Sequence, residues 1–155
     1  MKLEMVRDWM TRDVVTVKTS TTLSDAYEIM TNHKIRRLPV VGDDGRLIGI
    51  VTHGDIRNAQ PSPVNSLNIW ELSFMLARLT VAEIMTTDPI TISENATIGE
   101  AAQELLAHTI GSLPVTDNQG NLVGIITESD IFRMVVRAWQ HAQGDSPKPY
   151  AHYGA

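Results

Sequence analysis

The sequence contains no cysteine among its 155 residues. This absence excludes disulfide bonds, cysteine nucleophiles and thiolate metal sites. A chain without cysteine is also typical of the reducing cytoplasm, where disulfides rarely persist. We therefore predict a cytoplasmic protein.

Long hydrophobic runs are missing as well. A membrane-spanning helix needs about 18 consecutive apolar residues, whereas the longest apolar segments here, such as 47–51 and 122–126, have the length of strands. Residues 1–8 carry charges where a signal peptide needs its apolar run. We therefore expect a soluble protein with no membrane partner.

An excess of basic residues is the third absence. The formal net charge is -5, with 43% hydrophobic and 20% charged residues, which is ordinary for a soluble globular domain. Nucleic-acid-binding proteins usually carry a basic face, so we do not expect a nucleic-acid partner. One concentrated basic patch exists, made of His33, Lys34, Arg36 and Arg37.

What the sequence does contain is an internal repeat with an offset of 75 residues. Residues 6–59 align with residues 81–134 without a gap, and about a third of the positions are identical. The triplet that begins at Leu38 matches the one that begins at Leu113. Such agreement indicates two copies of one structural unit.

Each repeat predicts a strand, a helix, two strands and a short helix. β-branched runs indicate the strands, capping-box threonines begin the helices, and Asp-Asp-Gly is a hairpin turn sequence. In the first repeat we expect a strand at 14–17, a helix that begins after Thr22, strands at 38–41 and 47–51, and a short helix after Thr52. The fold class is therefore α+β. A unit of about 55 residues buries little apolar surface by itself, so the two should pack together.

The chain divides into two repeats with a connection between them. We place the repeats at residues 5–60 and 81–140, a linker and connecting helix at 61–80, and a loose tail at 144–155. Ser66 is expected to cap the connecting helix.

The connecting helix has an apolar stripe at helical spacing, formed by Ile69, Leu72, Leu76 and Leu79. Two interpretations remain open. The stripe packs inside the molecule, or part of it forms a dimer surface together with Trp70.

The repeated motifs resemble those of a known family. Met-Thr opens each unit and Leu-Pro-Val lies in its middle. Each unit closes with Gly-Ile, then Val-Thr or Ile-Thr, and an aspartate three residues after the threonine. This order is similar to that of a CBS-domain pair, or Bateman module, over about residues 5–140. The connecting helix and stand-alone form are similar to the acetoin-utilisation type of bacterial CBS protein.

The resemblance implies a pseudo-twofold pair of units with two clefts that can hold AMP, ADP, ATP or S-adenosylmethionine. It also implies a homodimer and a non-catalytic regulatory sensor that acts on an unidentified protein. The alternative is a structural or interaction protein of the same fold that binds no nucleotide. No cofactor is required for either role.

The family's ribose-binding aspartate corresponds to Asp55 and Asp130. An ionised carboxylate can accept hydrogen bonds from both hydroxyls of a ribose. Alternatively, each is an ordinary aspartate in the first turn of a helix. Thr52 and Thr127 match a position near phosphate, and N-capping is a second, compatible role.

An adenine ring needs a flat apolar slot. By the family's pattern the slot is lined by side chains of both repeats, with a methionine near each entrance. Plain core packing is the alternative for each of them. The lining residues are Val15 and Ile35 in the first repeat and Ile90 and Ile110 in the second, and the methionines are Met10 and Met85.

The repeats differ where relatives supply basic side chains to phosphate. The first has Arg36 and Arg37, and the second has Gly111 and Ser112. A guanidinium suits phosphate because its donors form a fixed fork, whereas Ser112 offers a hydrogen bond without charge. A charged strand edge is the alternative interpretation. We expect unequal clefts, and the sequence leaves open which cleft the arginines serve.

No pattern indicates catalysis or a metal. The five histidines lack the spacing of metal ligands, and no catalytic triad or carboxylate pair is present. His33 and His108 occupy equivalent positions near a helix end, where a cation complements the helix dipole. We therefore expect neither an enzyme nor a metal protein.

Overall fold

The computed structural model describes residues 3–60 and 68–144 and has a mixed α+β fold, as the sequence predicted. None of the helices in these two ranges has the length and apolar character needed to cross a membrane. The helices are α1 (Val6–Trp9), α2 (Leu23–His33), α3 (His53–Ala59), α4 (Ile69–Arg78), α5 (Ile98–His108) and α6 (Glu128–Gln143), with a 3-10 turn at Val81–Glu83. The strands are β1 (Val17–Lys18), β2 (Arg37–Val41), β3 (Leu47–Thr52), β4 (Thr86–Thr87), β5 (Ile92–Ser93), β6 (Ser112–Thr116) and β7 (Leu122–Thr127).

The chain forms two compact units, each with its own core. One consists of Val15–Pro89. The other combines the residues up to Val14 with those from Ile90 onward. The units are therefore not identical to the sequence repeats, because the first segment of each repeat packs in the unit built mainly from the other repeat.

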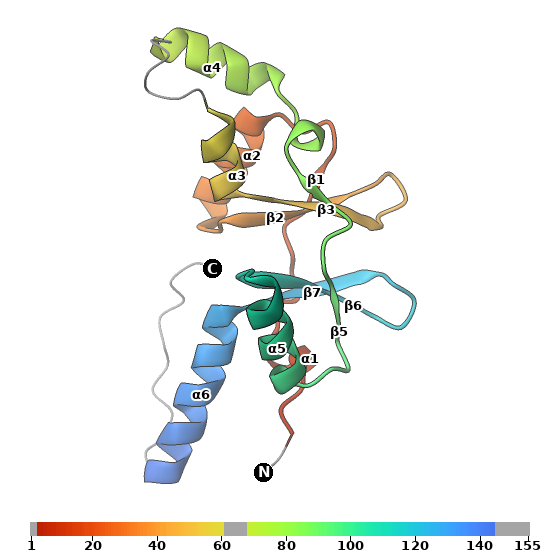
Figure 1. Cartoon of the computed structure of the whole chain (residues 1–155), viewed down its shortest axis with the longest axis vertical. Helices are drawn as coiled ribbons and strands as arrows, with labels where there is room; N and C mark the ends of the chain where they lie inside the picture. The colour runs from red at the N-terminus through yellow and green to blue at the C-terminus, as the bar shows by residue number, and fades with distance from the viewer. Residues whose placement is uncertain (1–2, 61–67, 145–155) are drawn as a thin grey trace. The chain divides into compact units, whose positions relative to one another are not determined.

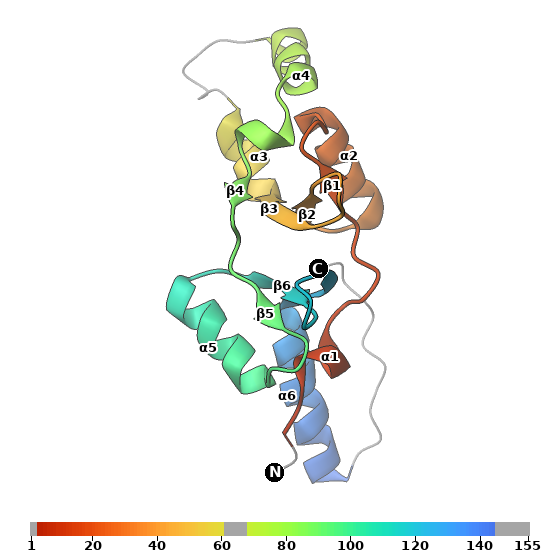
Figure 2. The ribbon, with the colours of Figure 1, turned by 90° about the vertical axis from the view of Figure 1, so that its right-hand side faces the viewer.

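The unit of Val15–Pro89 contains a sheet with the strand order β1-β2-β3-β4. β1 is parallel to β2, while β2 with β3 and β3 with β4 are antiparallel. Helices α2 and α3 cover one face of this sheet (Figures 1 and 2). The core lies between them, and its fully buried side chains include Leu23, Met30, Leu38 and Ile56.

The second unit repeats this design with a sheet of order β5-β6-β7. Helices α5 and α6 cover one face of it (Figures 1 and 2). Its core includes Ile98, Leu105, Leu113 and Ile126, together with Val6 from the start of the chain.

We call residues 6–14 and 81–89 the exchanged segments, because each packs in the unit built mainly from the other repeat. Equivalent hydrogen bonds hold both of them in place. The amide of Val6 donates to the carbonyl of Ala96 at 2.9 Å, and the amide of Val81 donates to the carbonyl of Thr21 at 2.8 Å. Both valines are fully buried. Burial of each valine side chain contributes about 1.5–3 kcal/mol. The hydrogen bond also satisfies a buried amide that would otherwise be costly. Both effects stabilise the segment that contains the valine.

Two local predictions change, and two others fall on residues that the structure does not describe. The first strand covers only residues 17–18 and not 14–17, since only Val17 and Lys18 pair with β2. The connecting helix begins at Ile69, where Asn68 accepts hydrogen bonds from the amides of Trp70 and Glu71. Ser66, the linker at 61–67 and the tail at 145–155 lie outside the described residues.

The apolar side chains of α4 divide between the two interpretations of its stripe. Leu76, and Leu79 directly after the helix, pack against the core of their unit. Ile69, Trp70 and Phe74 are 74%, 80% and 61% exposed. The core interpretation is therefore confirmed for one part of the helix only.

Candidate functional site

Thr52 and Asp55 lie at the junction of β3 and α3. The β3 strand ends at Thr52, which becomes the N-cap of α3. The amide of Thr52 donates to the Asp55 carboxylate at 2.8 Å, and the Thr52 hydroxyl accepts from the amide of Asp55 at 3.1 Å. This reciprocal capping box satisfies two amides at the helix start and holds the carboxylate in one orientation.

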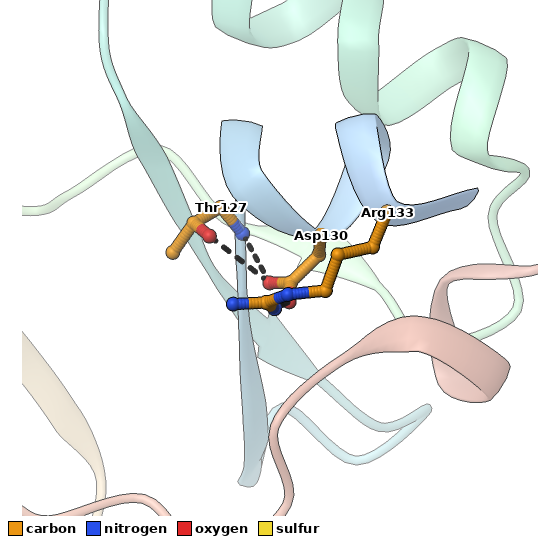
Figure 3. A network of polar contacts seen from close by, with 3 residues as sticks. All are labelled: Thr127, Asp130 and Arg133. Carbon is orange, nitrogen blue, oxygen red and sulfur yellow. Dashed lines mark hydrogen bonds and ion pairs between the residues drawn. The ribbon is translucent and has the colours of Figure 1, made fainter. Parts of the chain in front are cut away.

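Thr127 and Asp130 occupy the equivalent junction of β7 and α6. One carboxylate oxygen of Asp130 accepts from the amide of Thr127 at 2.8 Å and from its hydroxyl at 3.1 Å. The other oxygen pairs with the guanidinium of Arg133 at 2.5 Å, one helical turn along α6 (Figure 3). Both Thr127 and Asp130 are buried, whereas Thr52 and Asp55 are half-buried.

The sheet places the predicted phosphate-binding positions beside these junctions. Arg37 is opposite Thr52 in the antiparallel pairing of β2 and β3, and Ser112 is opposite Thr127 in that of β6 and β7. Directly opposed residues of an antiparallel pair project from the same face with Cβ atoms about 5 Å apart. The amide of His53 also donates to the carbonyl of Arg36 at 2.8 Å. The charge difference between the repeats therefore lies next to the Thr-x-x-Asp turn.

The alternative interpretation, in which the arginines guard an open strand edge, fits only the end of β2 at which Arg37 lies. β2 lies between β1 and β3. Its pairing with β1 is limited to Val40 and Val41, however, so Arg37 has a strand neighbour on one side. Arg36 is exposed and Arg37 is half-buried.

The predicted adenine-lining residues separate cleanly by unit. Val15, Ile35 and Met85 are half-buried against the core of the first-repeat unit. Ile90 and Ile110 are half-buried against the core of the second-repeat unit, in which Met10 is a core residue with 8% exposure. In each unit, the predicted lining residues come from one sequence repeat and the methionine comes from the other. The role of these side chains as a slot stays a prediction.

Each methionine lies over a glycine of the neighbouring strand. A Cβ added to Gly124 would lie 2.5 Å from the sulfur of Met10, and one added to Gly49 would lie 2.7 Å from that of Met85. Such distances are far below van der Waals contact, so only glycine fits beneath the methionine. This explains why Met-Thr and the Gly-Ile of the closing motif recur together.

The histidines have local structural contacts. His33 Nδ1 lies 3.0 Å from the carbonyl of Ile29, and His108 Nε2 lies 3.2 Å from the carboxylate of Glu104. Within residues 3–60 and 68–144, no cluster of three or more histidine, aspartate or glutamate side chains could hold a metal ion.

Arg133 is the site residue that sequence reasoning missed. Its signal lies in the aligned repeats, since the position three residues after the aspartate is Asn58 in the first repeat and Arg133 in the second. Residues three apart on a helix are neighbours on its surface. Comparison of these two positions shows a cation one helical turn after Asp130 and none after Asp55. Whether that cation pairs with the carboxylate is seen only in the structure.

Comparison with known protein families gives a match to the CBS domain at residues 6–62 and 81–137. A CBS domain-containing protein of Dictyostelium discoideum is 35% identical over 133 residues, which is 86% of this chain and 92% of that protein. A longer relative from Methanocaldococcus jannaschii is 33% identical, but the chain spans only 46% of its length.

Solved structures agree with this match. A candidate acetoin utilization protein (AcuB) from Vibrio cholerae has a TM-score of 0.74 and 32% identity over 94% of this chain and all of that one. The structure of CBSX2 in complex with AMP has a TM-score of 0.72 and 29% identity, and the match covers 88% of this chain and 98% of that one. CBSX2 is a CBS-pair protein from Arabidopsis thaliana. The CBS domain pair of MJ0100, solved with 5-methylthioadenosine and S-adenosyl-L-methionine, has a TM-score of 0.73 and 28% identity, covering 88% and 99%.

Two family matches, one in each sequence repeat, cover most of the chain, and the predicted resemblance is confirmed. The chain belongs to the CBS domain family as a tandem pair of CBS domains.

Proposed function

We propose that the chain is a non-catalytic regulatory module that binds an adenosine-containing ligand such as AMP, ADP, ATP or S-adenosylmethionine. The observation that carries the proposal is the carboxylate of Asp55, which the capping box holds in a half-buried position. A fixed, partly desolvated carboxylate is suited to accept hydrogen bonds from the two hydroxyls of a ribose. The solved CBS pairs in complex with AMP and with S-adenosyl-L-methionine support this ligand class.

Arg37 supports a ligand that carries phosphate. It lies opposite Thr52 on the adjacent strand, on the side of the unit that also holds Asp55. A guanidinium and a phosphate form paired, charge-assisted hydrogen bonds. We therefore rank AMP, ADP and ATP above S-adenosylmethionine for the first-repeat site.

Regulation follows if the ligand binds two arrangements of the protein unequally. A ligand shifts a conformational equilibrium only by its difference in affinity for the two states. The ligand-bound arrangement would then be recognised by a partner protein. No chemical step on the nucleotide is part of the proposal.

The test is thermal unfolding and calorimetric titration with AMP, ADP, ATP and S-adenosylmethionine. A ligand at about 100 times its Kd stabilises the folded state by about 2.7 kcal/mol, so a clear rise in Tm is expected for at least one of them. GMP serves as the control for the base. No heat and no rise in Tm with any adenosine compound would contradict the proposal.

A structural or interaction role is the alternative. It is favoured by the exposed Ile69, Trp70 and Phe74 of α4. Replacement of both Asp55 and Asp130 by alanine separates the two roles. The sensor predicts loss of ligand binding with assembly intact, while the interaction role predicts no change in either property.

We also propose that the chain forms a homodimer through exposed apolar helix surfaces. α4 contributes the three side chains named above, and α6 contributes Phe132, Val135 and Trp139, which recur at helical spacing. Large exposed apolar patches mark interaction surfaces. Sedimentation velocity should show a dimer that Trp70→Ser and Trp139→Ser weaken, whereas a monomer at all concentrations would contradict this.

A further inference from the structure

The two ribose-binding candidates differ in how many of their acceptor positions are already used. An ionised carboxylate offers about four lone-pair positions. Asp130 receives hydrogen bonds from the Thr127 amide, the Thr127 hydroxyl and Arg133. Among the described residues, the carboxylate of Asp55 receives one, from the amide of Thr52. Asp55 therefore retains capacity for both hydroxyls of a ribose, and Asp130 retains capacity for about one.

Asp130 receives two hydrogen bonds more than Asp55, one from the Thr127 hydroxyl and one from Arg133. Only the second of these comes from a residue type that differs between the repeats. Arg133 projects from α6 three residues after Asp130, and its side chain is 29% exposed while that of Asp130 is 6% exposed. The equivalent residue on α3 is Asn58, which is exposed and makes no hydrogen bond to Asp55 within the described part of the chain. Asn58 is shorter and uncharged, so it cannot form with Asp55 the ion pair that Arg133 forms with Asp130.

We infer that Arg133 is a specificity-determining residue that occupies Asp130 in place of a ribose hydroxyl, so that Asp55 is the principal acceptor for the ribose cis-diol. This inference rests on the proposed function and assigns the two carboxylates unequal roles. A nucleoside reaches the Asp130 carboxylate fully only when Arg133 leaves it. The ion pair thus acts as an internal competitor in the second repeat.

The direct test measures ligand binding at each carboxylate in the absence of the other. Asp55→Ala leaves only Asp130, and Asp130→Ala leaves only Asp55, in the full-length chain. Adenosine is the probe because it carries the cis-diol without a phosphate that Arg133 could itself attract. Binding is measured by calorimetry, and circular dichroism with thermal unfolding checks that each variant folds.

Two reciprocal substitutions then exchange the competitor. In the Asp55→Ala background, Arg133→Asn should tighten adenosine binding by about threefold to tenfold, the worth of one hydrogen bond. In the Asp130→Ala background, Asn58→Arg should weaken it by a similar factor. Arg137→Asn is the matched control, because Arg137 lies on the same helix, is exposed and contacts the ring of Trp9 instead.

The affinity for deoxynucleosides, measured in the same two backgrounds, provides a second test. Removal of one ribose hydroxyl should weaken binding clearly at Asp55 and little at Asp130, because Asp130 has room for only one. After Arg133→Asn, the two sites should respond alike.

The outcomes separate this inference from the proposed function. Adenosine binding that Arg133→Asn leaves unchanged or weakens would overturn the inference while the sensor function stands. Loss of AMP binding on Arg133→Asn with adenosine unaffected would also overturn it, since Arg133 would then be a phosphate ligand. Failure of the unsubstituted chain to bind any adenosine compound would overturn both.

Discussion

The junction of β3 with α3 and that of β7 with α6 have the same backbone and different electrostatics. In each, a strand ends at a threonine whose amide donates to the aspartate three residues later. Asp130 is buried and paired with Arg133, whereas Asp55 is half-buried and its capping partner Thr52 lies opposite Arg37 in the sheet. The duplication therefore retains the residues that shape the turn. The charged residues around the two carboxylates differ. In the second repeat Arg133 pairs with Asp130, whereas in the first repeat Arg37 lies opposite the threonine of the turn.

The largest effect that would test this comparison is the loss of the Asp55 carboxylate. Asp55→Ala should weaken AMP binding by about 100-fold, because two hydrogen bonds to a charged acceptor are lost, each worth about 1.5 kcal/mol or more. Asp130→Ala should weaken the strongest binding event by less than about threefold. Calorimetric titration of both variants measures the difference. Equal losses in the two variants would remove the distinction between the junctions.

The second effect concerns the methionine–glycine contact that both units share. Gly124→Ala would place a Cβ 2.5 Å from the sulfur of Met10 and 2.9 Å from the carbonyl oxygen of Thr11, and Gly49→Ala gives 2.7 Å and 3.0 Å to Met85 and Thr86. Overpacking of this kind costs about 1–3 kcal/mol. Since a backbone oxygen cannot move aside as a side chain can, both variants should unfold at lower denaturant concentration, Gly124→Ala more so.

Gly45→Ala is an instructive contrast to that pair. Nothing lies within 4 Å of a Cβ at this position, but the φ angle of 78° is unfavourable for other residues. Its cost should come from backbone strain alone, at about 1 kcal/mol. A loss at Gly124 no larger than that at Gly45 would show that the methionine packs less tightly than the structure indicates.

A smaller effect is expected for the cap of α3. Thr52→Ala removes the acceptor for the amide of Asp55 and should destabilise the unit by about 1 kcal/mol. Thr52→Ser keeps that acceptor and is the matched control. Urea unfolding of the two variants measures the difference, and an equal loss in both would exclude capping as its cause.

The smallest effect is a pH dependence that belongs to the second-repeat unit. Hydrogen bonds from Thr97 lower the pKa of Glu100, and those from Asn121 lower the pKa of Asp117. The folded-state pKa values thus lie below the unfolded values, so the stabilisation is present at neutral pH and is lost as the pH falls below the ordinary values of 4.5 and 3.8.

Variants test this acid sensitivity. Glu100→Gln and Asp117→Asn should flatten the loss of stability between about pH 5 and pH 3, measured by urea unfolding at each pH. Asp25→Asn, at the repeat position equivalent to Glu100, is the comparison in the first-repeat unit. A slope that the two substitutions leave unchanged would assign the acid sensitivity to other groups.

Much of the fold could be predicted because its signals are local and occur twice. The threonine caps of α2, α3 and α5, and the glycines of both hairpin turns, follow from short-range backbone chemistry. The exchanged first segments could not be predicted in this way. Val6 and Val81 are equivalent in the repeat, so the pattern does not say which copy of the core each one fills.

The candidate site shows the same limit. The sequence indicated the aspartates, the threonines and the charge difference at Arg37 and Ser112. The length of the first strand was predicted wrongly because Val14 to Thr16 have β propensity but no partner strand within the described structure. The occupation of Asp130 depends on a side-chain contact, which repeat conservation alone does not reveal.

The most direct test of unequal sites is a calorimetric titration of the unsubstituted chain with AMP, with the number of sites left free in the fit. We predict one strong binding event per chain, followed by a second that is at least about tenfold weaker. The strong event should disappear in Asp55→Ala and persist in Asp130→Ala. Two equal events that both aspartates support alike, or no binding at all, would contradict the account.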